Sequence, residues 1–126
     1  MPRFVLLFHD CSEVPDAESH WDLMLEQAGV LLTWRLRQLP DQWHAAAPGE
    51  TPELTAVAAQ RLPDHRIAYL DYEGPITGNR GQVSRWDHGH YSPLEESNGV
   101  LRVELVGQRV RATIELPTDP PPPQLA

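Results

Sequence analysis

Two histidines and one aspartate have the types and spacing of a metal site. His9 ends an apolar segment, and His20 and Asp22 lie two residues apart in the next one. Residues i and i+2 of a strand point to the same face, so His20 and Asp22 can converge on one ion, and His9 joins them if its strand lies alongside. Two imidazoles and one carboxylate leave coordination positions open and suit Mn²⁺, Fe²⁺ or Zn²⁺. The alternative is that His20 and Asp22 are polar residues on the wet face of an amphipathic strand.

A second group combines a histidine, an arginine and a tyrosine over residues 64–69. His65 could act as a general acid, Arg66 as an anion-binding cation and Tyr69 as a hydroxyl donor. A polar turn that enters a strand is the simpler interpretation of the same residues. The segment 87–90 (DHGH) also contains metal-ligand residue types. Its glycine and its position at the end of a predicted strand favour a plain exposed turn.

The cysteine count and the charge balance restrict the function classes. Cys11 is the single cysteine, so we expect no intrachain disulfide and a reducing, cytoplasmic setting. Nothing in its sequence context indicates an activated thiol nucleophile. The formal net charge of −8 argues against general non-specific nucleic-acid binding, although a local arginine patch stays open. All the permanent side-chain cations are arginines, and the absence of lysine excludes a Walker-type phosphate loop.

The elements that must position these residues are short strands. Apolar and alternating patterns predict single strands over residues 3–8, 66–72 and 83–86, the last followed by a turn at 87–89. Two β-hairpins are predicted, over residues 20–36 with a turn at 27–29 and over residues 100–116 around 107–108.

The remaining segments are less regular. Residues 37–53 have the composition of a long loop, and the pattern over 52–60 fits either a short helix or a strand. Together these segments predict a mainly β fold, a compact antiparallel β-barrel with one or two short helices, in a single domain over residues 1–117. Residues 118–126 contain four consecutive prolines and are expected to form a flexible tail.

Several segments, taken in order, resemble a known family. They are similar to the 3′-phosphoesterase domain of bacterial DNA ligase D, an end-joining ligase. The similar segments are RFVLLFHD (3–10), HWDLMLE (20–26), GVLLTW (29–34), DHRIAYLDYEG (64–74), GNRG (78–81), RWDHGHY (85–91) and VELVGQRVRATIEL (103–116). No single segment is specific, but the ordered set is.

The resemblance implies a compact β-barrel that processes 3′ ends of nucleic acids. It implies a divalent ion, most often Mn²⁺, with Zn²⁺ or another transition metal as alternatives. By motif position its ligands are His9, His20 and Asp22, the same trio that strand geometry selects. His65 and Tyr69 fall on the family positions that act at the phosphate. The reactions implied are removal of 3′-terminal ribonucleotides and 3′-phosphates.

One position departs from the family pattern. The arginine expected two residues after the metal-binding aspartate, where it contacts phosphate, is Met24 here. Arg66, Arg80 or Arg85 could supply the missing cation from another strand. Glu26, four residues beyond the aspartate on the same face, could orient a ligand or a metal-bound water.

Two function hypotheses follow. The first is a metal-dependent phosphoesterase that acts on nucleic-acid 3′ ends or on a smaller phosphate ester, with activity reduced or altered by the methionine. The second is a non-catalytic, metal-containing β-barrel module that docks on a DNA-repair protein. The acidic net charge and Met24 favour the second hypothesis, and the ordered motifs make a β-barrel without any site the least favoured interpretation.

Overall fold

One curled sheet accounts for almost all of the regular structure. The computed structural model describes residues 1–40, 43, 54–55 and 57–118. Within them lies one short 3-10 helix, η1 (Ile67–Leu70), beside nine strands. The strands are β1 (Arg3–Asp10), β2 (His20–Gln27), β3 (Val30–Leu36), β4 (Leu54–Thr55), β5 (Ala59–Arg66), β6 (Gly74–Pro75), β7 (Gln82–Ser97), β8 (Val100–Gly107) and β9 (Arg111–Pro117).

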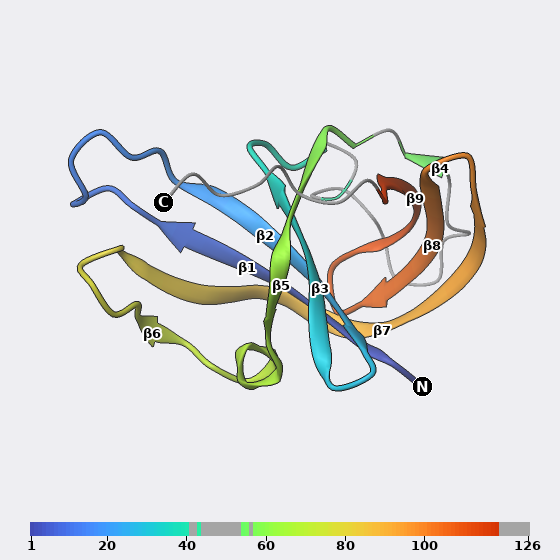
Figure 1. Cartoon of the computed structure of the whole chain (residues 1–126), viewed down its shortest axis with the longest axis horizontal. Helices are drawn as coiled ribbons and strands as arrows, with labels where there is room; N and C mark the ends of the chain where they lie inside the picture. Colours follow the sequence, from blue (N-terminus) through green and yellow to red (C-terminus); the bar gives the residue numbers. More distant parts are fainter. Residues whose placement is uncertain (41–42, 44–53, 56, 119–126) are drawn as a thin grey trace.

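The strand order makes β1 a central strand. The sheet runs β4-β9-β8-β7-β1-β2-β3-β5, with β6 paired to β7, and the β4–β9 pair is parallel whereas the other pairs are antiparallel. The sheet curls into a half-barrel (Figure 1). A hydrogen bond joins β3 to the end of β9 across it. There the indole N–H of Trp34 donates a 2.7 Å hydrogen bond to the carbonyl of Pro117. The mainly β, antiparallel architecture expected from the sequence is confirmed.

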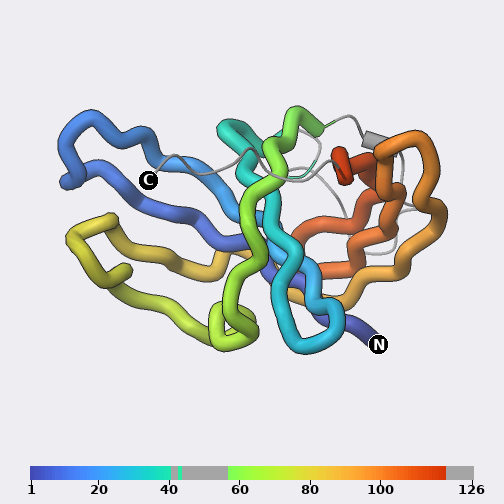
Figure 2. The backbone as a smooth tube through the Cα atoms, in the orientation of Figure 1, coloured from blue at the N-terminus to red at the C-terminus, as the bar shows by residue number. Residues whose placement is uncertain are grey.

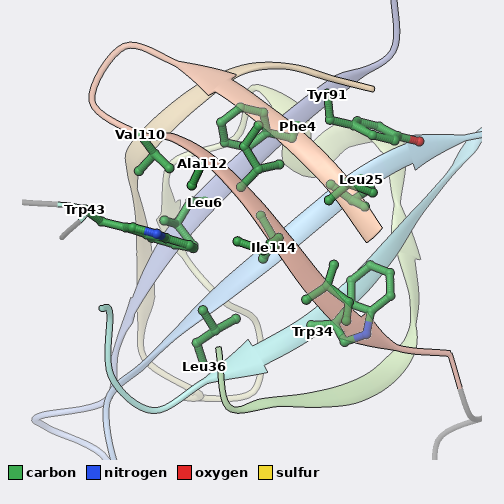
Figure 3. Packing of buried hydrophobic residues seen from close by; sticks show 14 of the residues in the cluster. Phe4, Leu6, Leu25, Trp34, Leu36, Trp43, Tyr91, Val110, Ala112 and Ile114 are labelled. Atoms are coloured by element: carbon green, nitrogen blue, oxygen red, sulfur yellow. The ribbon is translucent and has the colours of Figure 1, made fainter. Parts of the chain in front are cut away.

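The concave side of this sheet holds the main hydrophobic core. Alternating residues of β1, β2, β3, β8 and β9 point inward, and Trp34, Leu36 and Ile114 are completely buried among them (Figure 3). The opposite face of β1–β3 carries a second, smaller apolar cluster: Val5, Leu7, Met24, Leu31, Leu70 and Val83. Strands β1 to β3 are therefore buried on both faces, and the second cluster lies on the face that carries the candidate ligands.

Two connections meet at one end of the sheet. Figure 2 shows the β1–β2 connection and the β6–β7 connection together at the left of the view. The ring of His9 and the carbonyl of Arg80 are joined there by a 2.6 Å hydrogen bond. Gly81 adopts φ +88°, and a Cβ at this position would collide with the carbonyl oxygen of Asp10. This close approach of two backbones requires glycine.

The strand predicted over residues 66–72 is wrong. Strand β5 ends at Arg66, and the next residues form η1, in which the Asp71 N–H bonds to the carbonyl of Ala68. This turn buries Leu70 in the second cluster and leaves Ile67 exposed. Leu70 is the buried residue of η1, so the apolar residues of this segment do not mark one face of a strand.

The turn predicted at residues 87–89 is also wrong, because β7 continues through it from Gln82 to Ser97. Asp87 is only 2% exposed and accepts hydrogen bonds from four backbone N–H groups. Gly89 does not form a turn. A Cβ there would collide with the carbonyl of Val106 on β8, so the glycine allows two strands to approach.

Both predicted hairpins are confirmed, as β2–β3 and β8–β9. For the segment 52–60, the sequence left helix and strand open. Leu54–Thr55 form strand β4 and Ala59 begins strand β5, whereas residues 52–53 and 56 lie outside the described residues. The loop predicted over 37–53 and the tail from residue 119 onward also lie largely outside them. Within the described ranges, no helix has the length and hydropathy that a membrane crossing demands.

Candidate metal and phosphate site

Neighbouring strands bring the two histidines and the aspartate together. His9 on β1 is the direct cross-strand partner of His20 on β2, and their ring centroids are 4.7 Å apart. Asp22 follows two residues later on β2 and shares the face of His20. Both His20 and Asp22 are buried. The convergence expected from strand geometry is therefore present.

The Asp22 carboxylate lies between the two rings. Its Oδ2 is 3.7 Å from His9 Nδ1, and its Oδ1 is 3.4 Å from His20 Nε2. The other ring nitrogens contact backbone carbonyls: His9 Nε2 lies 2.6 Å from the oxygen of Arg80, and His20 Nδ1 lies 3.1 Å from that of Glu18. A carbonyl can only accept, so these outer nitrogens carry the hydrogens. In the neutral rings, the two inner nitrogens then present lone pairs toward the carboxylate.

The electrostatics of this cluster keep the carboxylate ionised. Burial alone would raise the pKa of Asp22, but the interactions with His20 and His9 outweigh it and lower the pKa to about 2. The pKa of His9 is raised, chiefly by Asp22, against the opposing effect of burial. The ionised carboxylate of Asp22 thus lies between two imidazole rings, and this arrangement favours the binding of a cation.

His20 and Asp22 present two atoms that fit a divalent metal ion. His20 Nε2 and Asp22 Oδ1 are buried, and neither has a hydrogen-bond partner within the described part of the chain. Two ligand atoms that are each about 2.1 Å from one ion are themselves roughly 3.0–3.4 Å apart. The observed 3.4 Å between these two atoms meets that requirement. An ion would satisfy both orphaned atoms and relieve the repulsion between lone pairs.

Cys11 adds a second candidate ligand set that the sequence did not suggest. His9, Cys11 and His20 can each place one ligand atom within 4.8 Å of the others, so this trio could also hold a metal. The thiol is buried, and burial raises its pKa, which disfavours the thiolate that a metal needs. We therefore favour Asp22 as the third ligand. The i, i+2 spacing of His9 and Cys11 was the available signal.

A cavity joins the metal cluster to the second group. It has a volume of about 330 Å³, and its lining includes His9, Asp22, His65, Tyr69 and Arg80. The rings of His65 and Tyr69 form an edge contact with centroids 5.8 Å apart. His65 Nδ1 lies 2.8 Å from the carbonyl of Pro63, and because a carbonyl only accepts, this nitrogen carries a hydrogen. The Nε2 atom of His65 is then the nitrogen that can interact with a ligand. Residues far apart in the sequence therefore share one space.

Three predicted supporting residues do not line this cavity. Glu26 accepts a hydrogen bond from the backbone N–H of Arg3 through its carboxylate, near the start of β1. Arg85 contacts the carboxylate of Asp71 at 3.8 Å. Arg66 is exposed at the start of η1. Of the predicted cations, the structure brings only Arg80 to the cavity.

Two further residues complete the lining. Met24 is 2% exposed and packs in the second apolar cluster, so the face shared with Asp22 is less wet than its polar residues suggest. Arg35 on β3 is the cross-strand partner of Asp22 and reaches the same cavity. Sequence reasoning missed Arg35, although the register of the β2–β3 hairpin could have found it. Counting outward from the turn at Ala28–Gly29 pairs residue 35 with residue 22.

Comparison with known proteins identifies the family to which the chain is similar. The chain matches a family model described as the DNA Ligase D 3′-phosphoesterase domain over residues 9–117, from the first candidate ligand to the end of β9. It is 31% identical over 100 residues to the multifunctional non-homologous end joining protein LigD of Mycobacterium bovis, which covers 72% of the chain. The protein of that name from Mycolicibacterium smegmatis is 31% identical over 124 residues, covering 86% of the chain.

These relatives are much longer proteins. The aligned region is 12% of the Mycobacterium bovis protein and 14% of the Mycolicibacterium smegmatis protein, so the chain corresponds to one segment of each. The family match, in contrast, extends over most of the chain and over all the strands from β2 to β9. The chain is therefore a member of the DNA ligase D 3′-phosphoesterase domain family.

Proposed function

We propose that this chain is a divalent-metal-dependent phosphoesterase that acts on 3′-phosphate or 3′-ribonucleotide ends of nucleic acid. Family membership supports a phosphoesterase role at nucleic-acid ends. The observation that carries the finer proposal is the cavity in which His9 and Asp22 meet His65 and Tyr69. A metal cluster and two phosphate-directed side chains around one space are what phosphate-ester hydrolysis needs.

His9, His20 and Asp22 would hold the ion, which we take to be Mn²⁺. A bound ion of this kind polarises a phosphoryl oxygen and neutralises charge that develops in the transition state. The carbonyls of Arg80 and Glu18 support the proposal because they fix the ring nitrogens that stay free to bind. The metal identity and this ligand set are part of the proposal.

His65 and Tyr69 would act on the phosphate itself. His65, in its protonated form, would give a proton from Nε2 to the leaving 3′ oxygen as its bond to phosphorus breaks and a water oxygen takes its place. Tyr69 would donate its O–H to a phosphoryl oxygen. The edge contact between the two rings keeps them side by side. The products would be a 3′-hydroxyl end and either inorganic phosphate or the released nucleoside phosphate.

The partners and setting belong to the same proposal. The substrate would be a nucleic-acid 3′ end or a smaller phosphate ester, reached directly or through a DNA-repair protein. The single free cysteine is consistent with a reducing, cytoplasmic compartment.

The test is Mn²⁺-dependent turnover of a primer–template that ends in a 3′-phosphate, with a second substrate that ends in one ribonucleotide. We expect release of phosphate by the wild-type chain, loss of activity with EDTA and recovery with Mn²⁺. His20→Ala should reduce turnover by about 100-fold or more. His90→Ala is the matched control, because His90 is an exposed histidine of β7 outside the cavity and should leave turnover unchanged.

Two results would count against the proposal. Turnover that survives in His20→Ala would show that the reaction uses another site. Absence of turnover on both substrates, with Mn²⁺ binding still lost in His20→Ala, would favour the alternative of a metal-containing module that binds a repair partner without catalysis.

A further inference from the structure

Arg35 brings a cation to the site from strand β3. It is the direct cross-strand partner of Asp22, so both side chains project from the same face of the β2–β3 hairpin. It lines the same cavity of about 330 Å³ as His9, His65 and Tyr69. A guanidinium, two imidazoles and a phenol therefore border one space beside a single buried carboxylate.

The guanidinium of Arg35 has hydrogen-bonding capacity to spare. Its Nε is buried and has no hydrogen-bond partner within the described part of the chain. None of the ion pairs formed among the described residues includes it. The residue is half-buried, so an anion in the cavity meets a partly desolvated cation. A planar guanidinium matches the geometry of two phosphate oxygens.

The other arginines near the site are already engaged. The guanidinium of Arg80 donates to the carbonyl and the hydroxyl of Thr77, at 2.7 and 3.3 Å. Arg85 lies against Asp71 and the carbonyl of Leu70. Among the arginines that reach the cavity, Arg35 is therefore the one whose guanidinium stays available to a ligand within the described structure.

The charged side chains around the cavity favour the binding of an anion. Asp22 is the one carboxylate in its described lining, and both imidazoles of the metal cluster flank it. Arg35 and Arg80 add positive charge to the same lining, in a chain whose formal net charge is −8. A terminal phosphate with two negative charges gains more from such a position than a phosphodiester with one.

We propose that Arg35 binds the terminal phosphate of a nucleic-acid 3′ end in this cavity and gives the site its preference for that end over a 3′-hydroxyl end. The proposal rests on the phosphoesterase function proposed above. It assigns the phosphate-binding role to β3, where the chain has an arginine, rather than to β2, where Met24 packs in the second apolar cluster.

The test compares two oligonucleotides that differ only in a 3′-phosphate or a 3′-hydroxyl. Fluorescence anisotropy with the EDTA-treated full chain measures both affinities without turnover. We expect tighter binding of the phosphate end by the wild type, and a loss of about tenfold or more of this preference in Arg35→Gln. Arg35→Lys keeps the charge without the planar fork and should retain part of the preference.

Arg109→Gln is the matched control. Arg109 is exposed in the β8–β9 turn and lines neither this cavity nor the neighbouring cavity of about 380 Å³ that His9, His20 and Arg35 border. Its substitution should change the affinities for both oligonucleotides by a similar factor and leave the ratio of the two affinities unchanged. Thermal melting of each variant verifies folding. If Arg35→Gln does not fold, the ratio of the two affinities is compared between the wild type and Arg35→Lys instead.

The outcomes separate the two proposals. A folded Arg35→Gln that keeps the wild-type ratio would overturn the inference, and so would a wild type without any preference for the phosphate end. In either case, the measurement of Mn²⁺-dependent turnover still tests the proposed phosphoesterase function independently. A preference that depends on Arg35 in a chain without turnover would support the inference and overturn the proposed function.

Discussion

Asp87 ties strand β7 to the β8–β9 turn, and its replacement by alanine is predicted to cost about 3–5 kcal/mol of folding free energy. Its buried carboxylate accepts the backbone N–H groups of Gln108, Arg109 and Val110 at 2.8–3.2 Å, besides that of His88 at 2.8 Å. The bonds to Gln108, Arg109 and Val110 span 21–23 residues of sequence. Strand β7 in turn pairs with β1, the strand that carries the first candidate ligand.

The magnitude follows from the number of bonds lost. Hydrogen bonds to charged groups are worth about 1.5–3 kcal/mol each, and three of those to Asp87 come from the distant turn. Water that enters the space left by alanine will recover part of this sum, which gives the value of about 3–5 kcal/mol. For a chain of this length, that corresponds to a fall in Tm of roughly 12–20 °C.

Urea unfolding followed by circular dichroism measures the change. Asp87→Asn keeps the volume and one acceptor oxygen but replaces the other with a donor, so a smaller loss of about 2 kcal/mol is expected. Glu95→Ala, at an exposed position on the same strand, is the control and should leave the midpoint unchanged. A loss below about 1 kcal/mol in Asp87→Ala would contradict this prediction, since the backbone N–H groups of the turn would then be satisfied without the carboxylate.

Two further predictions concern the site and the backbone around it. In EDTA-treated protein, Asp22→Asn should lower the pKa of His9 toward its ordinary value of 6.5, as read from an NMR titration of the imidazole, because the carboxylate is the main cause of the raised pKa. The stability that the His9–Asp22 pair contributes is present below the unfolded pKa of the histidine and is lost as the pH rises through its folded pKa. A His9 pKa that stays unchanged in Asp22→Asn would contradict the prediction. Gly81→Ala should cost about 2 kcal/mol or more in thermal melting, because the new Cβ meets the Asp10 carbonyl at a positive φ. Gly29→Ala, also at positive φ but in open space, should cost less, and equal losses would count against the proposed collision.

The alternating patterns predicted the hairpins and the shared face of the ligands because both depend on local periodicity. The spacing of His20 and Asp22 put them on one face of any strand, whereas His9 could join them only if its own strand lay alongside. The register that sets His9 opposite His20 is a property of the β1–β2 pair that the spacing alone did not predict.

The rest depended on contacts that no local pattern contains. Asp87 and Gly89 have the composition of a turn, and only the approach of β8 explains their place within a long strand. The burial of Met24 results from a second apolar cluster that η1 completes from a distant part of the sequence. Arg35 was identifiable only from the register across the β2–β3 turn.

Calorimetric titration of the full chain with Mn²⁺ tests most directly whether His9, His20 and Asp22 form a metal site. We expect one Mn²⁺ site in the wild type, loss of binding in His20→Ala and Asp22→Asn, and retained binding in Cys11→Ser. Binding that is lost in Cys11→Ser and kept in Asp22→Asn would contradict this ligand set and favour the trio that includes the thiol. A wild-type chain that binds no Mn²⁺, or binds it equally well without His20, would contradict the metal site itself.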